Sequence, residues 1–442
     1  MFGAALASVL GWFYSAAALD HARVVNTAKS RGDQSAYLFE AQIYYRNWHG
    51  LNAPPVAQPR NRMPLYPSFL AAIYRPAWTD PEFFEIAKAA SVYLSLALVA
   101  ITGVVAFRYF SPLPALNFTT IVAFGYFIFK AGYAQADLLF YTLHFLSFVA
   151  CWQMLVGRPG VWRIVGAAAA GVLAGLAYLT KAANLPFAAV AAAVPAGQAA
   201  VALIRTRRAS ALHVAAPAVL FGAVFLLILS PYLLTTKRIH GQYFYSLATV
   251  IVWYDDYASA SVAILSYGPD GWPPGPSSLR PGPPKYWREH SLADIGGRIG
   301  HGFRDMIAVS FRGYMFLSPL SLSAIAAALV AATRRSIVAG LVRRHMALAV
   351  FLLVYAGLYV PAIAFYEPTS GTGTARFLLA HFAPLLFALT ALLTHPEVAA
   401  QRWHAAGLVL TMQQFHWMVA LIWAADLIFV LPHRLMTTYG GF

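Results

Sequence analysis

The sequence has few charged residues and only one cysteine. Of its 442 residues, 11% are Asp, Glu, Lys or Arg, whereas a soluble domain carries roughly 25%. The lone Cys151 excludes an intramolecular disulfide. The sequence also contains no P-loop, no H-E-x-x-H or paired-cysteine zinc motif, and no G-x-S-x-G motif. These absences argue against a soluble globular protein and give no support to the common nucleotide-binding, zinc-dependent or serine-hydrolase classes.

Long uncharged stretches are present instead. Hydrophobic residues make up 60% of the chain, and its mean hydropathy is +0.61. About 20 apolar residues span a bilayer, where only helices or closed barrels satisfy the backbone. The runs are unbroken, unlike the alternating pattern of barrel strands. We predict an all-α polytopic membrane protein with about eleven transmembrane helices, forming a single transmembrane domain over residues 1–442. The clearest runs cover residues 89–107, 138–157, 182–204, 209–236, 313–333, 345–366, 377–395 and 405–425.

Two long polar segments, residues 20–88 and 237–305, interrupt these runs. Residues 1–19 form the first predicted span rather than a cleaved leader, because no basic residue precedes their apolar stretch. With a cytoplasmic N-terminus, the inner short loops hold eleven arginines, and the outer ones hold only Lys130, Lys181 and Arg376. Basic residues in short loops mark the cytoplasmic side. Both long segments and the tail from residue 431 are therefore predicted to be exoplasmic.

The two long loops differ in character. Residues 37–48 of the first loop repeat aromatic and apolar side chains at helical spacing, which predicts a helix lying on the membrane. Residues 62–75 carry interfacial aromatics and two prolines. Residues 268–284 of the second loop are too rich in Gly and Pro for regular structure, which predicts a covering or partner-binding loop. The net charge of +15 follows from the positive-inside bias, so no nucleic-acid partner is expected.

Two carboxylates stand out as candidate catalytic groups. Asp33 begins the predicted interfacial helix, where a carboxylate can accept a proton or hold a metal; the competing interpretation is a helix N-cap. Asp137 lies at the outer end of the predicted fourth span with no charge in the next twenty residues. Ionisable residues at membrane depth usually face a cavity or a partner, and a cap or a solvated charge is the alternative. His144 lies on the same helix face, where a packed histidine is a better interpretation than a substrate contact.

Two cations on the same side could bind an anion. Lys181 follows a small-residue helix, and Arg376 opens a late span after the Gly/Thr stretch of residues 371–374. Arg can bind phosphate through two bonds, and Lys acts as a point charge. The alternative is that both side chains extend to the lipid headgroups. Asp255 and Asp256 form the only adjacent carboxylate pair and suit acceptor binding, a metal or a solvated loop.

The order of these motifs resembles the membrane-integral glycosyltransferases of the GT-C superfamily, in the branch of protein mannosyltransferases and lipid A aminoarabinose transferases. Gly32-Asp33-Gln34 with Tyr37 is similar to the family's acidic motif after the first span. Residues 61–67 (NRMPLYP), which include Arg62 and Tyr66, resemble its proline-tyrosine-proline stretch. Asp137 matches a second acidic position, residues 175–181 (GLAYLTK) resemble the helix ending in Thr-Lys, and residues 376–379 (RFLL) resemble the arginine that opens a late span.

The resemblance implies sugar transfer, with inversion, from a polyprenyl-phosphate donor to an exoplasmic lipid, glycan or protein. Asp33 would be the base, and Arg376, Lys181 and Arg62 would bind the donor phosphate. Asp137 would orient the site or share a divalent metal with Asp33, and no other cofactor is expected. Tyr37 and Tyr66, which lie in the matched motifs, would line the substrate pocket. His144, Asp255 and Asp256 lie outside the matched motifs and are pocket candidates from their residue types and positions alone. The expected location is a bacterial inner membrane with an exoplasmic active site, and membrane lipids are expected partners.

Two other functions stay open. An exoplasmic polysaccharide polymerase or ligase would use Arg288, His290 and His301 in the second long loop. A lipid or solute transporter would need charges at the bilayer midplane and repeat symmetry. Isolated polar residues of the last spans could serve such a path, although hydrogen bonds between helices explain them equally well. They are Gln413, Gln414, His416 and Asp426.

Overall fold

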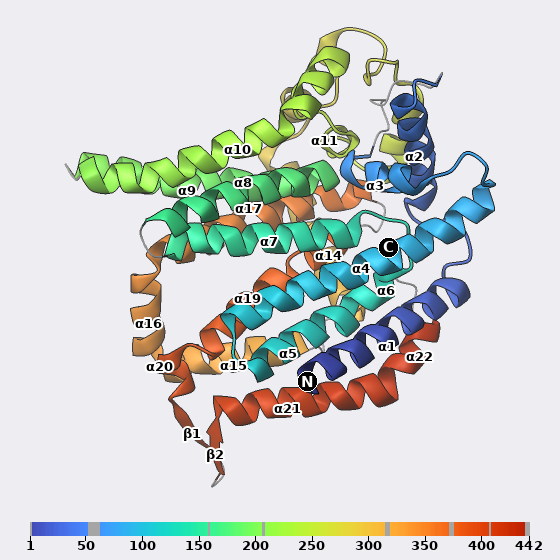
Figure 1. Ribbon diagram of the computed structural model, residues 1–442. Coiled ribbons are helices and arrows are strands. Elements are labelled where there is room, and N and C mark those ends of the chain that lie inside the picture. The colour runs from blue at the N-terminus through green and yellow to red at the C-terminus, as the bar shows by residue number, and fades with distance from the viewer. Residues whose placement is uncertain are drawn as a thin grey trace.

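The chain folds into a bundle of long helices in the computed structural model (Figure 1). The structure describes residues 2–51, 62–157, 160–205, 208–313, 319–370, 375–405 and 408–437. Within these ranges the only sheet is a two-stranded antiparallel hairpin, β1 (Arg402–Ala405) and β2 (Leu408–Thr411). The expected all-α class is confirmed apart from this hairpin.

Nine helices of the described ranges are long and apolar enough to cross a membrane. A tenth span results if α15 (Pro319–Thr333) and α16 (Arg335–Arg344), which meet at a bend of 102°, are counted together. The protein is therefore a multi-pass membrane protein. The helix α1 (Phe2–Val24) is not among the nine, so the predicted total of eleven stays a prediction. The nine spans are α4 (Asp80–Tyr109), α5–α6 (Pro112–Ala131), α7 (Asp137–Val156), α8 (Val161–Thr180), η2–α9 (Ala182–Ile204), the Ala215–His240 part of α10 (Arg208–His240), α17 (Met346–Ser370), α18–α19 (Arg376–Leu393) and α21–α22 (Met412–Thr437).

Shorter elements gather at the ends of the spans. The interfacial helices predicted in the first long loop exist as α2 (Gln34–Trp48) and α3 (Leu65–Ile73), which pack on each other. The second long loop contains α11 (Leu247–Ile251), α12 (Tyr257–Leu265), η3 (Ser277–Leu279) and α13 (Pro283–Glu289). At the opposite end, α16 runs across the bundle next to α20 (Pro396–Ala399) and the hairpin (Figure 1).

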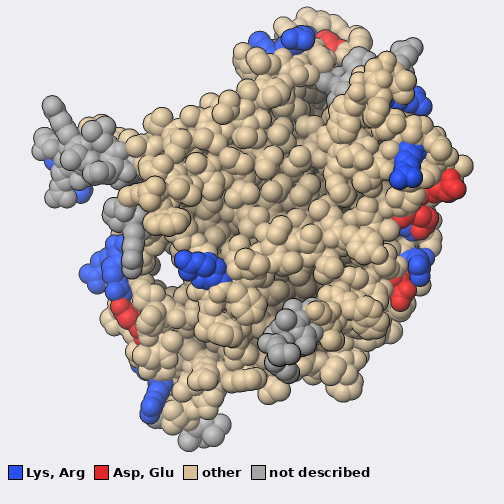
Figure 2. Space-filling view, in the orientation of Figure 1, with Lys and Arg blue, Asp and Glu red and all other residues tan. Residues whose placement is uncertain are grey.

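Charged side chains are also concentrated away from the middle of the spans. On the face shown in Figure 2 they lie mainly at two opposite ends and along one margin, and the broad area between them is almost free of Lys, Arg, Asp and Glu. Large hydrophobic side chains such as Leu226, Leu227 and Leu353 are exposed on the surface of the spans. A surface of this kind suits lipid, since the hydrocarbon core excludes charge.

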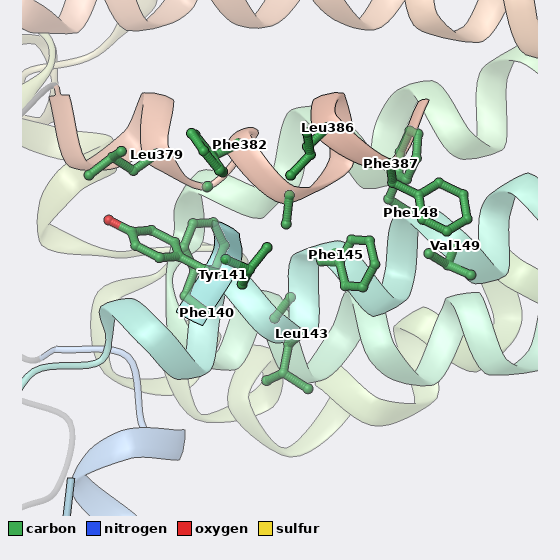
Figure 3. Packing of buried hydrophobic residues seen from close by; sticks show 14 of the residues in the cluster. Phe140, Tyr141, Leu143, Phe145, Phe148, Val149, Leu379, Phe382, Leu386 and Phe387 are labelled. Carbon is green, nitrogen blue, oxygen red and sulfur yellow. The ribbon is translucent and has the colours of Figure 1, made fainter. Parts of the chain in front are cut away.

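The core is aromatic and centres on α7. Phe140, Phe145 and Phe148 of α7 are buried and face Phe382 and Phe387 of α19 (Figure 3). The rings of Phe145 and Phe387 meet edge to face, with centroids 5.7 Å apart. Such pairs add about 0.5–1.5 kcal/mol beyond the burial of their area. The helix that begins at Asp137 is therefore fixed along its length.

Small residues set how closely other helices approach. A Cβ on Gly175 of α8 would lie 2.7 Å from the Cγ2 of Ile228 on α10, and one on Gly171 would lie 2.7 Å from the Phe221 carbonyl oxygen. This four-residue spacing of glycines permits close contact of membrane helices. It brings the end of α8, which carries Thr180, close to the loop that follows α10.

Several predicted boundaries need correction. The first long loop is shorter than residues 20–88, because α1 continues to Val24 and α4 already begins at Asp80. There Thr79 and Glu82 form a capping box with Pro81 in the first turn. The second loop has no boundary at residue 305, since α14 (Leu292–Gly313) is one continuous helix that runs through this position. The last span begins at Met412 rather than 405 because the hairpin precedes it. The expected tail from residue 431 is helical to Thr437.

Candidate active site

A cavity of about 300 Å³ lies where several helices end. The end of α8, the start of η2, the end of α17 and the start of α18 (Ala375–Leu379) all reach it, and α2 and α11 supply further walls. Five predicted site residues line this cavity: Asp33, Tyr37, Arg62, Lys181 and Arg376. The structure therefore brings together residues that are up to 343 positions apart in the sequence.

Asp33 is held between two arginines. Its Oδ1 accepts a hydrogen bond from Nη2 of Arg62 at 2.8 Å, and its Oδ2 accepts one from Nη1 of Arg376, also at 2.8 Å. Its side chain is 21% exposed, and that of Arg376 only 15%. Asp33 precedes the first residue of α2, yet its side chain makes no capping hydrogen bond. The alternative interpretation of Asp33 as a side-chain N-cap is therefore wrong, because the carboxylate is turned to the arginines.

Asp137 is the centre of a second ion-pair group. Its Oδ2 accepts a hydrogen bond from Nζ of Lys130 at 3.1 Å, and its Oδ1 accepts one from Nζ of Lys181. The side chains of Asp137 and Lys130 are only 2% and 3% exposed. Asp137 is thus neither a solvated charge nor a side-chain cap. Lys130 was not a predicted site residue, although it lies seven positions before Asp137.

The two groups are electrostatically linked. Burial would raise the pKa of Asp33, but the charges of Arg62, Arg376 and Lys181 outweigh it and hold the pKa below its ordinary 3.8. Burial, with a smaller effect of the Arg376 charge, lowers the pKa of Lys181 to about 8, in spite of the opposing charge of Asp137. Asp33 is therefore ionised at neutral pH, and Lys181 titrates close to the physiological range.

Glu40 is a further acidic residue that the sequence interpretation missed. Its Oε1 accepts a hydrogen bond from the backbone N–H of Arg62 at 2.7 Å, which fixes the chain beside α2. Its Oε2 is buried and has no hydrogen-bond partner among the described residues. Burial raises its pKa to about 8, more than Arg62 lowers it. Glu40 lies seven residues after Asp33, about two turns into α2, and this spacing could have indicated it.

Arg376 is positioned by the backbone of a short helix. The Tyr141 hydroxyl of α7 donates a 2.7 Å hydrogen bond to the Arg376 carbonyl, and the Tyr359 hydroxyl donates one of 3.3 Å to the Phe377 carbonyl. These bonds satisfy carbonyls that α18 leaves open before α19 (Phe382–Leu393) begins. Residues 371–374, whose Gly/Thr pattern was noted in the sequence, lie outside the described ranges.

Other predicted residues lie outside the cavity. Tyr66 is buried behind Tyr37, with ring centroids 5.2 Å apart, and its hydroxyl pairs with Ser91. His144 is buried in the core, where its Nδ1 pairs with the Asn184 side chain at 2.8 Å. Neither residue is part of the cavity lining. Tyr66 therefore supports the Tyr37 wall, and His144 is a packed histidine in this structure.

The adjacent carboxylates of the second long loop also have local roles. The carboxylate of Asp255 lies 2.9 Å from Nε2 of His290, and the Asp255 side chain is 67% exposed. The Asp256 carboxylate accepts a 2.7 Å hydrogen bond from the Ser259 N–H and caps α12. The cavity wall from this loop comes instead from Ser246, Thr249 and Val252. The structure does not place Asp255 or Asp256 at the cavity.

The residues at the cavity do not fit a divalent metal. Asp33 and Asp137 each face two cationic nitrogens, which would repel a metal ion. Among the residues that the structure describes, no group of three or more His, Cys, Asp or Glu side chains could hold a metal. A cation would also need six or more oxygen ligands if it were Ca²⁺ or Mg²⁺. The charge distribution instead favours an anion.

The fold and the cavity together define a helical multi-pass membrane protein with a cationic, partly apolar cavity at one end of its bundle. No family model matches the chain, and neither a curated protein nor a solved structure matches it.

Proposed function

We propose that the protein is a glycosyltransferase that moves a sugar, with inversion, from a polyprenyl-phosphate donor to an acceptor hydroxyl. The observation that carries the proposal is the cavity in which Arg62, Lys181 and Arg376 converge around Asp33. Guanidinium groups are well suited to phosphate because they present paired donors. Three converging cations with one carboxylate provide both a phosphate site and a proton acceptor.

The apolar part of the cavity supports a lipid-linked donor. Leu185, Ile363 and Phe377 line it together with the charged residues. A ligand that fills both parts needs an anionic head and a hydrocarbon chain. Since the cavity lies at the ends of α8 and α17, the chain of such a ligand would extend beside the spans into the bilayer. A free nucleotide sugar has no hydrocarbon chain that could pack against this apolar wall.

In the proposed reaction the acceptor oxygen attacks the anomeric carbon while the carbon–oxygen bond to phosphate breaks. The phosphate leaves with the electron pair, and Asp33 accepts the acceptor's proton. Arg62 and Arg376 stabilise the charge that develops on the leaving phosphate, which is usually a large term in catalysis. Asp137 positions Lys181 through their ion pair. When the donor phosphate accepts hydrogen bonds from the arginines, the arginines stabilise the Asp33 carboxylate less. The pKa of Asp33 then rises, and Asp33 becomes a better base.

We also propose the number of spans and the orientation of the chain in the membrane. Counting α1 and the α15–α16 pair as one span each gives eleven spans. In that pair α15 crosses the membrane and α16 lies along its cytoplasmic surface, so the N-terminus is cytoplasmic and the cavity is exoplasmic. The two ends of α16 are basic, with Arg334 and Arg335 at its start and Arg343 and Arg344 at its end, which agrees with the positive-inside rule. A bacterial inner membrane supplies polyprenyl-phosphate donors to that side. The acceptor would enter past α11.

The polymerase or ligase alternative has less support. Arg288 donates to the Ser278 carbonyl, and His290 pairs with Asp255, so both residues stabilise the second long loop. His301 lies on the exposed face of α14. None of the three lines the cavity. These local roles leave the arginines of the cavity as the better candidates for phosphate chemistry.

Arg376 provides the test of the phosphate site. Purified protein is given a polyprenyl-phosphate sugar, and sugar transfer is measured; the donor is chosen from the lipid-linked sugars that accumulate when the protein is deleted. Arg376→Ala is expected to abolish most transfer, and Arg376→Lys to restore only part, because one ammonium cannot replace bidentate bonding. An alanine variant that folds and transfers sugar at the parent rate would reject the proposed role.

A further inference from the structure

The cavity and its surroundings hold more positive than negative charge. Four cationic side chains form the two linked ion-pair groups, and only two of the neighbouring carboxylates are paired with them. The cations are Lys130, Lys181, Arg62 and Arg376, and the carboxylates are Asp33 and Asp137. All sixteen Asp and Glu residues of the chain lie within the described ranges. No undescribed acidic side chain can therefore balance this surplus.

Glu40 does not change this count at neutral pH. Its pKa is raised to about 8, so its carboxyl group is mainly protonated at pH 7. Its contact with the Arg62 segment is a hydrogen bond from the backbone N–H, not an ion pair with the guanidinium. The protein thus presents a surplus of two positive charges around the cavity. Buried charges are costly unless they are paired, so the site favours a ligand with two negative charges.

A second observation points to a missing acceptor. The Nε–H of Arg62 is buried and has no hydrogen-bond partner in the part of the chain that the structure describes, although Arg62 lines the cavity and its Nη2 binds Asp33. A buried guanidinium donor without an acceptor is costly. A phosphate group offers several acceptor oxygens, whereas a carboxylate offers two. The geometry and the charge therefore both favour a phosphoryl group.

We infer that the cavity binds its lipid phosphate best as a dianion, so that the released polyprenyl monophosphate, and not the sugar-bearing diester, is the tighter ligand. This inference rests on the proposed function. A sugar phosphodiester carries one negative charge, and cleavage of its bond to the sugar leaves a monoester with two. The surplus of two positive charges matches the monoester.

The charge balance of the reaction also affects product release. Before transfer, the site has a surplus of two positive charges and the donor has one negative charge. After transfer, Asp33 carries the acceptor's proton, so the site has a surplus of three and the product has two negative charges. The total is unchanged, but the attraction between site and product is stronger than that between site and donor. Release of the lipid phosphate then requires Asp33 to lose its proton.

Three small probes test the inference on the purified full-length protein at pH 7.5. Farnesyl phosphate is a dianion there, because the second pKa of a phosphate monoester is about 6, and farnesyl methyl phosphate is a monoanion with the same chain. The monoester is expected to bind about tenfold tighter or more by calorimetry, the size of one charge-assisted hydrogen bond. Inorganic phosphate has the charge without the chain and is expected to bind much more weakly.

Each other result has a distinct meaning. Equal affinity for the two farnesyl phosphates would overturn the dianion inference and leave the proposed function standing. No binding of either would reject both. Binding of uncharged farnesol as tight as farnesyl phosphate would reduce the cavity to an apolar groove. Inorganic phosphate binding as tight as farnesyl phosphate would overturn the lipid assignment and indicate a site for free phosphate.

Two variants of the charged cluster sharpen the test. Lys181→Met lowers the surplus to one, so the preference for the monoester is expected to shrink several-fold. Lys29→Met is the matched control, because Lys29 pairs with Asp80 outside the cavity and its side chain is 47% exposed. Asp33→Asn raises the surplus of positive charge and is expected to strengthen binding of the monoester. Should Lys181→Met not fold, the Asp33→Asn result decides alone, and weaker binding of the monoester there would overturn the inference.

Discussion

Asp33 and Lys181 show how neighbours determine what an ionisable side chain can do. Asp33 has a lowered pKa because two guanidinium groups and Lys181 outweigh its burial. Such a carboxylate is a weak base until an anion competes for the same donors. In Lys181, by contrast, burial outweighs the neighbouring charges and lowers the pKa to about 8. The protonation of Lys181 is therefore sensitive to pH near 8.

We expect donor affinity to fall as pH rises through about 8. Binding of a phosphate needs the protonated Lys181 ammonium, whose fraction decreases above its pKa. Lys181→Arg keeps the charge and does not titrate in this range, so the donor affinity of this variant is expected to fall only at higher pH. The measurement is the KM for the lipid-linked donor from pH 6 to pH 9.5.

Glu40 is the control for this profile, since its pKa also lies near 8. Above that pH it becomes anionic next to Arg62, which would weaken anion binding in the same direction. Glu40→Gln removes this titration and keeps an acceptor for the Arg62 N–H. Profiles of Lys181→Arg and parent that overlay would exclude Lys181, and a shift in Glu40→Gln alone would assign the effect to Glu40.

Some of the site could be predicted from individual residues. Lys181 and Arg376 were predicted from their positions at the ends of spans, Asp33 from its position before the interfacial helix, and Arg62 only from the family resemblance. The structure places all four side chains at one cavity. Lys130 and Glu40 were missed because their importance depends on what lies next to them in space. Conversely, Asp255 and Asp256 attract notice in the sequence, but local partners account for both.

At the scale of elements, apolar runs predicted the long helices well, whereas their ends depended on contacts far away in the sequence. The α4 helix begins before its apolar stretch because Thr79 and Glu82 cap it. The polar residues before Gly313 continue as α14, since this helix packs along α17. Neither feature raises hydropathy, so the runs alone could not place these boundaries.

The contact between α14 and α17 gives an element-scale prediction. A Cβ on Gly302 would overlap the carbonyl oxygen of Ala364 on α17, so Gly302→Ala must push the helices apart. We expect a loss of about 1–3 kcal/mol of stability, which is typical of overpacking. Gly300→Ala on the same helix is the matched control, because nothing lies within 4 Å of its added Cβ. Thermal unfolding of the purified variants measures both, and equal midpoints would contradict the close approach.

At the scale of the molecule, the described helices define a multi-pass membrane protein, and its orientation stays a prediction from charge. Eleven arginines on one side against three basic residues on the other favour a cytoplasmic N-terminus. The count of spans depends on two cases that hydropathy does not decide. One is α1, and the other is the 102° bend between α15 and α16.

Single-cysteine labelling tests the orientation. Ser277 in η3 and Ser336 in α16 are both exposed, and the native Cys151 is buried. In intact cells, an impermeant thiol reagent is expected to label Ser277→Cys and not Ser336→Cys. Labelling of Ser336→Cys alone would reverse the orientation and place the cavity on the cytoplasmic side. Both variants should be labelled after the cells are opened, which controls for access.

The central claim is that Asp33 accepts a proton during sugar transfer, and Asp33→Asn tests it most directly. Asn preserves the size of the side chain and can still accept a hydrogen bond from an arginine, so the variant is expected to fold and insert normally. It cannot act as a base, and loss of general-base catalysis lowers rates by roughly 10²–10⁴-fold. We expect purified Asp33→Asn protein, given the lipid-linked sugar, to transfer sugar slower by about that factor. Transfer within a few-fold of the parent rate would contradict the catalytic role of Asp33.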